Sequence, residues 1–228
     1  CCCCCCCWCC GCCVVVFVWW LAFLVGFFFL DLYTSGYAYP LLIWLCDAAR
    51  NEAEIGDWLE QVNPRNYVAL GLRSALYAHP ADRPPGAAAG SGAATILDRC
   101  AAVLRRVDSI VNLHPERRYV AGAGPAGQIA IDWLLRRPDW FAGGIAIDAS
   151  AGAAAAWRAQ ATDWDQRRLL WIETGLSPGP APAAEPEALR CLGLAVESWT
   201  AEHGASWPAV SDKINAWVMS AIPTAVCK

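Results

Sequence analysis

From Tyr39 onward, short apolar runs alternate with stretches whose apolar positions recur every three or four residues. The apolar runs predict buried strands at Leu41–Cys46, Asn66–Leu72, Arg118–Ala121, Phe141–Ile147 and Arg168–Ile172, and a weaker strand at Gly193–Glu197. The amphipathic stretches predict helices at Asn51–Val62, Thr95–Asn112, Pro125–Arg137 and Pro208–Ser220. Strands that alternate with helices favour an α/β fold, in which a mostly parallel sheet carries helices on both faces.

The first 30 residues contain no charged side chain, and residues 14–30 form a continuous apolar run. A helix that spans a bilayer needs about 20 apolar residues, so the segment predicts membrane association through residues 1–30. No Lys or Arg precedes Arg50, so the segment lacks the basic start of a signal peptide and predicts no membrane orientation. An alternative is that the aromatic stretch Gly26–Pro40 is a strand and loop of the domain, in which case a membrane helix ends near Val25.

We place the domain boundary after residue 26, which gives an N-terminal segment of residues 1–26 and one α/β domain of residues 27–228. The 17 Lys+Arg and 21 Asp+Glu residues all lie after residue 30. The chain without its first 30 residues is about 200 residues long, which suits one domain with a sizeable core. The absence of a basic excess excludes a nucleic-acid partner, and 57% hydrophobic residues argue against disorder.

Cysteine is concentrated at the start of the chain, where 11 of the 15 cysteines fall within the first 13 residues. Three interpretations remain open: a palmitoylated anchor, a metal-thiolate tract, or a repeated codon read in another frame. The chain does not begin with Met, which also fits a fragment or a processed product. An unbroken run lacks the spaced Cys pairs of a zinc site, so no metal is expected. The other four cysteines are too far apart to form a disulfide scaffold, and they are Cys46, Cys100, Cys191 and Cys227.

The segment from Arg117 to Ser150, RRYVAGAGPAGQIAIDWLLRRPDWFAGGIAIDAS, resembles the α/β-hydrolase superfamily. The likeness is to its esterase, polyester-depolymerase and phospholipase/carboxylesterase branch. There a strand, a G-x-S-x-G turn, a helix, a Pro-Asp/Glu-x-Phe turn and a second strand follow one another. The likeness extends upstream through YPLLIWLCDAARNE and downstream to EHGASWPAV, and so covers roughly residues 27–228. The resemblance implies an α/β-hydrolase-like three-layer sandwich and a serine-esterase site.

In that family the Ser of G-x-S-x-G sits at a strained strand-to-helix turn, and the next residue donates its backbone N–H to the oxyanion. Gly124 stands at the serine position in this chain, and Pro125 follows it. Glycine fits a strained turn better than serine does, so the turn is expected to persist without a nucleophile. Pro125 has no N–H, so the oxyanion donor is missing as well, although proline is also favourable at the start of any helix.

The other catalytic positions of the family are replaced too. A later loop reads ETGLSP, which places Ser177 where the resemblance implies the catalytic acid. The family's His-x-Trp-Pro segment reads ASWP here, so Ala205 stands where the base is implied. Cys46 and Asp47 replace the family's His-Gly, and a carboxylate at Asp47 would repel a developing oxyanion.

These replacements predict a non-catalytic protein of the α/β-hydrolase fold, with a binding or structural role and with membrane tethering as an option. Its ligand would be a small apolar or ester-like molecule, and no cofactor is expected. The alternative is a hydrolase of carboxylic esters that uses relocated groups, with His203 as base and Ser150 or Ser177 as nucleophile. His203 lies two residues before Ala205 and reaches the same crevice only after a loop shift; otherwise it is a solvent-facing loop residue. A third option is a fragment without a function of its own.

Three further groups of residues are candidate sites. Asp148 follows an apolar strand and is either a binding carboxylate or the N-cap of the next segment. His79 and His114 lie in predicted loops beside prolines, with no partner in view. The sequence GAGPAG resembles a glycine-rich phosphate loop, but it lacks the third spaced glycine and Pro125 lacks a donor, so no dinucleotide is expected.

Aromatic and sulfur side chains complete the candidates. The thiol of Cys46 has no general base in view and is expected to be buried and inert. The tryptophans of the second half are expected in the core or in partner contacts, with a Trp-lined crevice for an apolar or glycan ligand as the alternative. They are Trp133, Trp140, Trp157, Trp164, Trp171, Trp199, Trp207 and Trp217.

Overall fold

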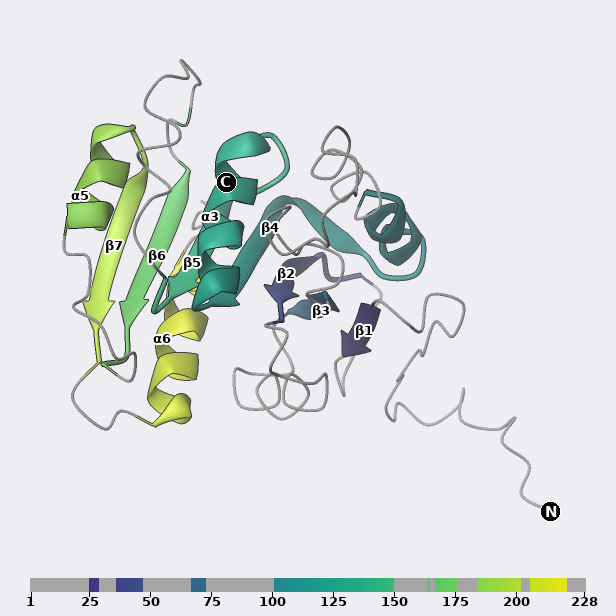
Figure 1. Cartoon of the computed structure of the whole chain (residues 1–228). Helices are drawn as coiled ribbons and strands as arrows, with labels where there is room; N and C mark the ends of the chain where they lie inside the picture. Colours follow the sequence, from purple (N-terminus) through teal and green to yellow (C-terminus); the bar gives the residue numbers. More distant parts are fainter. Residues whose placement is uncertain are drawn as a thin grey trace, which may run out of the picture.

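The computed structural model describes residues 25–28, 36–46, 67–72, 101–149, 164, 167–175, 184–201 and 206–220. These residues form a seven-stranded sheet with the order β1-β3-β2-β4-β5-β6-β7 (Figure 1). The strands are β1 (Val25–Phe28), β2 (Tyr39–Leu45), β3 (Val68–Leu72), β4 (Leu113–Ala123), β5 (Gly143–Ile147), β6 (Arg168–Glu173) and β7 (Ala195–Thr200). β1 runs antiparallel to β3, whereas all other neighbouring strands are parallel.

Helices cover both faces of the sheet. The helices α3 (Pro125–Arg136) and α5 (Ala184–Cys191) pack on one face together with the helical residues 101–108, and α6 (Trp207–Ser220) packs on the other (Figure 1). Both faces of β2 are therefore buried, which explains its unbroken apolar sequence. The side chains of β2 alternate between the two faces, with Leu41, Ile43 and Leu45 toward α3 and Leu42 and Trp44 toward α6. The predicted three-layer α/β architecture is confirmed.

Some elements differ from the sequence-based expectation. β4 is longer than the predicted Arg118–Ala121. It begins at Leu113, which pairs with Tyr39 of β2, and the register shifts before Arg118 pairs with Leu41. Leu113 and Arg117 are both buried, although Pro115 and Glu116 between them are exposed. No helix is predicted at α5, because a helix of only eight residues shows too few turns of apolar periodicity. The predicted helix at residues 51–62 lies outside the described residues. So do residues 78–94, whose Ala, Gly and Pro content is typical of a loop.

β1 brings the end of the apolar N-terminal run into the sheet. Val25 pairs with Leu72 and Phe28 with Ala69, so the strand begins before the domain boundary placed after residue 26. A strand here agrees with the alternative interpretation of this stretch, in which a membrane helix ends near Val25. No helix in the part of the chain that the structure describes is long and apolar enough to cross a bilayer.

α3 packs against the end of β4 at a distance that only glycine permits. A Cβ atom on Gly122 would lie 2.5 Å from the carbonyl carbon and oxygen of Ala126 and 2.8 Å from the backbone N of Gly127. A Cβ atom on Gly127 would in turn lie 2.9 Å from the carbonyl oxygen of Gly122 and 3.1 Å from the Cβ of Ala149. Side-chain atoms do not fit at such distances, so these two glycines set the depth at which α3 sits on the sheet.

α6 is held on the sheet by side chains that bind its C-terminal carbonyl groups. Arg117 Nη2 donates to the carbonyl oxygen of Val218 (3.4 Å), and Arg168 Nη1 donates to that of Trp217 (3.3 Å). Arg168 Nη2 also donates to Ser220 Oγ (3.0 Å), and its guanidinium lies 4.5 Å from the centroid of the Trp217 ring. The last carbonyls of a helix lack intrahelical donors and carry partial negative charge, so the two guanidinium groups stabilise this end.

Two tyrosines under α6 differ in what their hydroxyl groups contact. The hydroxyl of Tyr67 donates to Asn215 Oδ1 on α6, and burial raises the pKa of Tyr67 against the opposing effect of Arg117. Tyr119 is fully buried, and its ring packs edge-on against Trp217 with 5.7 Å between the centroids. Its hydroxyl has no hydrogen-bond partner within the described part of the chain. The Tyr67 hydroxyl therefore stabilises the docking of α6, whereas the Tyr119 hydroxyl opposes folding.

Gly122→Ala is expected to lower the free energy of unfolding by about 2–3 kcal/mol, because the new methyl group must push α3 away from β4. Gly36→Ala is the matched control, since a Cβ atom on this exposed glycine meets nothing within 4 Å. Its effect should stay within about 0.5 kcal/mol. Urea denaturation of the two variants measures the difference, and equal midpoints would show that the close approach carries no stability.

Tyr67→Phe is expected to destabilise the protein by about 1–3 kcal/mol, because it leaves Asn215 Oδ1 without its donor. Tyr119→Phe removes a hydroxyl without a partner and should be neutral or stabilising by about 1 kcal/mol. The unfolded phenol ionises near pH 10, whereas the folded Tyr67 stays neutral, so its contribution is present below about pH 10 and is lost as the pH rises further. Unfolding curves recorded at rising pH should therefore show the wild type losing its advantage over Tyr67→Phe.

Candidate functional site at the carboxyl edge of the sheet

Gly124 forms the apex of the turn between β4 and α3. The turn lies at the edge of the sheet where the parallel strands end (Figure 1). Its φ of 56° and ψ of −128° are a combination that residues other than glycine adopt only under strain. The N–H of Gly124 donates to the carbonyl oxygen of Ile147 at the end of β5 (2.7 Å). A Cβ atom on Gly124 would meet nothing within 4 Å, so the space beside the apex is open.

The first turn of α3 has few backbone donors to offer a ligand. Pro125 has no N–H, and the N–H groups of Gly127 and Gln128 both donate to the carbonyl oxygen of Gly124, at 3.0 and 3.4 Å. A phosphate bound at a helix N-terminus requires such groups to be free. Pro125, Gly127 and Gln128 therefore offer no free amide at this turn, and Gly122 and Gly127 allow α3 to pack closely on β4.

Asp148 joins the ends of β5 and β6 beside this turn. Its φ is 46°, the one positive φ of a non-glycine residue in the described ranges. Its N–H donates to the carbonyl oxygen of Ile172 (2.8 Å), and its carboxylate accepts the N–H of Thr174 (2.8 Å) and the Thr174 hydroxyl. Asp tolerates the left-handed region better than most residues, and the hydrogen bonds offset the remaining strain. Through these two hydrogen bonds to Thr174, the Asp148 carboxylate links the end of β5 to the end of β6.

Thr174 is a site residue that the sequence analysis overlooked. It lies directly after β6 and is only 3% exposed, so its side chain is a fixed part of the edge. The preceding Glu173 links β6 to β7, because its Oε2 accepts the hydroxyl of Thr200 (3.4 Å). Its Oε1 accepts Trp171 Nε1 within β6 (3.0 Å). The signal in the sequence is a Thr placed immediately after an apolar strand, whereas the family resemblance implies Ser177 for the position of the catalytic acid.

The structure describes five of the candidate residues: Asp148, discussed above, His114, and the three considered next. Gly124 and Pro125 lie at the β4–α3 turn, and Cys46 lies at the end of β2. Cys46 is 2% exposed and its Sγ is 3.9 Å from the carbonyl oxygen of Trp44, which confirms that the thiol is buried. The other candidates lie outside the described residues and their roles stay predictions: Asp47, His79, Ser150, Ser177, His203 and Ala205.

The loop position predicted for His114 is wrong. His114 lies in β4, directly after Leu113, which pairs with Tyr39 of β2. Its Nδ1 accepts the N–H of Glu116 (3.2 Å). The core role predicted for most tryptophans is confirmed where the structure describes them. Trp133, Trp164, Trp171 and Trp217 are buried, and Trp140, Trp199 and Trp207 pack against the core.

Asp148→Ala is expected to lower the free energy of unfolding by about 2–4 kcal/mol, because it loses both bonds to Thr174 and leaves alanine in the left-handed region. Asp148→Asn is the matched control, since Asn tolerates positive φ and keeps a carbonyl oxygen for the Thr174 N–H. Its cost should be about 1 kcal/mol. Thermal and urea unfolding give both values, and an equal loss in the two variants would contradict the role given to this bond.

No protein-family model and no curated protein matches the chain. Solved structures match it in fold. The chain is 16% identical to a thermostable esterase, with a TM-score of 0.62 over 86% of this chain and 58% of that chain, so it spans little more than half of that esterase. It is 13% identical to the Bacillus cereus carboxylesterase, with a TM-score of 0.60 over 88% of this chain and 96% of that one.

An S-formylglutathione hydrolase from Staphylococcus aureus is similar as well, with 14% identity and a TM-score of 0.54 over 82% of each chain. At such low identity these likenesses concern the fold and not the chemistry. The mostly parallel sheet with helices on both faces agrees with this likeness. The chain therefore has the α/β-hydrolase fold that esterases and serine hydrolases share.

Proposed function

We propose that the chain is a non-catalytic protein of the α/β-hydrolase fold that binds a small apolar or ester-like molecule at the carboxyl edge of its sheet. The observation that carries this proposal is the pair Gly124–Pro125 at the β4–α3 turn. The apex of the turn has no side chain to act as a nucleophile, and the residue after it has no N–H for an oxyanion.

The magnitudes favour binding over hydrolysis. Loss of one oxyanion donor lowers turnover by about 10²–10³, and loss of a catalytic triad lowers it by about 10⁶. The geometry of the turn does not depend on either group, because Gly122 and Gly127 pack α3 against the sheet and the N–H of Gly124 bonds to Ile147. A fold can therefore keep its crevice after the reaction is lost.

The surroundings of Gly124 support a small ligand. The space beside the apex is open to a Cβ atom, so a ligand can approach the backbone there. Asp148 and Thr174 hold the neighbouring strand ends in fixed positions, which lowers the conformational entropy lost on binding. Phosphate-bearing ligands are disfavoured, because the amides of Gly127 and Gln128 already have acceptors.

The uncharged N-terminus adds a proposal of membrane association. β1 takes Val25–Phe28 into the sheet, so the contact with a bilayer would have to come from residues 1–24. Co-sedimentation of the full chain with phospholipid vesicles tests this, and a chain that stays in the supernatant argues against tethering.

The purified chain is expected to show no hydrolysis of p-nitrophenyl butyrate above the buffer rate and no labelling by a fluorophosphonate. The competing hypothesis is an esterase that uses His203 with Ser150 or Ser177. Activity that disappears in His203→Ala, Ser150→Ala or Ser177→Ala would overturn the proposal in favour of that hypothesis. Ser109→Ala is the matched control, because Ser109 is an exposed serine whose hydroxyl bonds to the carbonyl of Arg106.

Binding is tested separately through the melting temperature. p-Nitrophenyl butyrate is expected to raise the Tm of the wild type, since a ligand of the native state stabilises it. Gly124→Leu fills the space beside the apex and should abolish this rise, whereas Gly36→Leu, on an exposed turn, should keep it. Each variant is compared with its own ligand-free Tm, so that backbone strain at Gly124 cancels. A wild type whose Tm is unchanged by the ester would refute binding of this ligand class.

A further inference from the structure

β7 is the last strand of the sheet, with β6 on one side and no strand from the described ranges on the other (Figure 1). Most residues of β7 are exposed. The outer edge of such a strand carries backbone N–H and C=O groups that can pair with a strand from another molecule. How these groups are occupied decides whether the sheet can be extended at this edge.

The odd-numbered residues of β7 turn their backbone groups toward β6, as the bond from the N–H of Ala195 to the carbonyl oxygen of Arg167 shows (3.0 Å). Backbone groups alternate in direction along a strand, so the other residues turn outward. The outward residues are Val196, Ser198 and Thr200.

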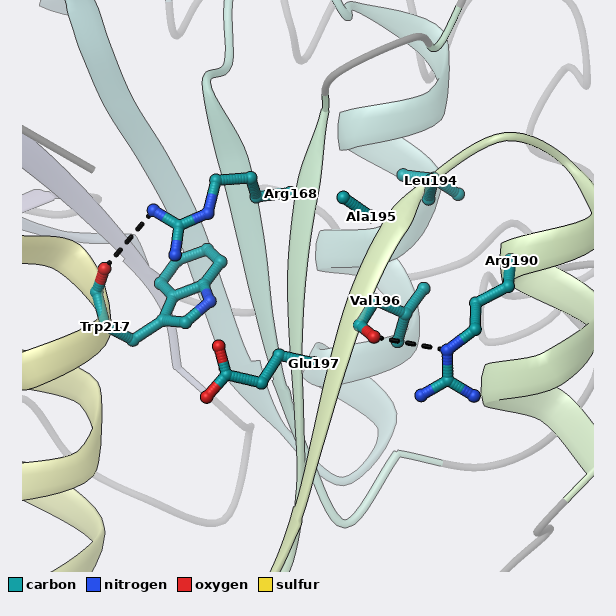
Figure 2. Close-up of a pocket in the computed structure, with 7 residues that line it drawn as sticks. All are labelled: Arg168, Arg190, Leu194, Ala195, Val196, Glu197 and Trp217. Carbon is teal, nitrogen blue, oxygen red and sulfur yellow. Dashed lines mark hydrogen bonds between the residues drawn. The ribbon is translucent and has the colours of Figure 1, made fainter. Parts of the chain in front are cut away.

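Arg190 of α5 lies along this outward edge, as Figure 2 shows for its contact with Val196. Its Nε donates to the carbonyl oxygen of Val196 (3.2 Å), its Nη2 to Ser198 Oγ (2.9 Å) and its Nη1 to Glu187 Oε2 (3.1 Å). The N–H of Val196 donates to the carbonyl oxygen of Leu194 (3.1 Å). Both outward groups of Val196 are therefore occupied from within the chain, and all three guanidinium nitrogens have an acceptor.

An open depression of about 500 Å³ lies along β7. Its lining includes Arg190 and Val196 on the α5 side and Arg168, Glu197 and Trp217 on the α6 side (Figure 2). Glu197 Oε1 accepts Lys213 Nζ at 2.6 Å, and Arg168 binds the end of α6. The charged groups that an incoming strand would meet are thus already partnered.

We propose that Arg190 closes the outer edge of β7 to strand addition, and that the partner it excludes is a second copy of this chain. In an antiparallel self-pair centred on Ser198, Val196 of each copy lies opposite Thr200 of the other. Such a pair needs the carbonyl oxygen of Val196, which Arg190 holds. It would also bury the guanidinium at the new interface, and a charge held at a strand edge opposes this.

Arg190→Ala is the variant that opens the edge. Sedimentation velocity in reducing buffer should show its weight-average mass rising with concentration toward about twice that of the wild type. Glu187→Ala is the matched control, because it removes one ion pair of Arg190 and leaves its contacts with β7 in place. The double variant Arg190→Ala/Ser198→Pro should return to the wild-type mass, since proline removes the outward N–H at the centre of the pair.

Far-UV circular dichroism identifies the variants that are folded, and Arg190→Gln replaces Arg190→Ala if the latter unfolds. A folded Arg190 variant that keeps the wild-type mass overturns the proposal. So does a double variant that still associates, because the contact would then lie elsewhere. A wild type whose mass falls on Ser198→Pro alone also overturns it, because the edge would already be in use.

Discussion

The close packing of α3 on the end of β4 is the constraint on which the carboxyl edge of the sheet depends. With no Cβ atom at Gly122 or Gly127, the helix backbone comes within contact distance of the strand, and the chain must reverse direction within one residue. Gly124 provides that reversal in a region of φ and ψ that other residues enter only under strain. This close approach of α3 to β4 sets the direction of α3. The open space at the apex and the bond to β5 follow from it.

Two features shape this edge of the sheet: one is formed by residues close together in the sequence, and the other by residues far apart in it. The turn is local, because residues 122–127 are contiguous and recognisable in the sequence. The tie between Asp148 and Thr174 is long-range, because the two residues become neighbours only when β5 and β6 pair. Neither feature depends on a catalytic group, so this edge of the sheet keeps its shape whether or not the chain catalyses a reaction.

The same difference in sequence distance explains which parts of the structure the sequence could predict. Strands with unbroken apolar runs, such as β2 and β6, and the Gly124–Pro125 turn were predictable, because their signals lie within a few residues. The extension of β4 to Leu113 was not, since it depends on Arg117 being buried under α6, far along the chain. Thr174 was missed for the same reason, as its partner Asp148 comes from another strand. The short helix α5 was missed because it is stabilised by packing of Leu189 rather than by its own sequence.

The order of strands has a consequence for how this chain is made. β2 lies between β3 and β4, so the N-terminal strands leave one side of the apolar β2 uncovered until residues 113–123 have been synthesised. During translation this unpaired edge is available to other hydrophobic strands, and the chain passes through an aggregation-prone stage before β4 arrives. β4 is thus the strand whose synthesis commits the nascent chain to its sheet.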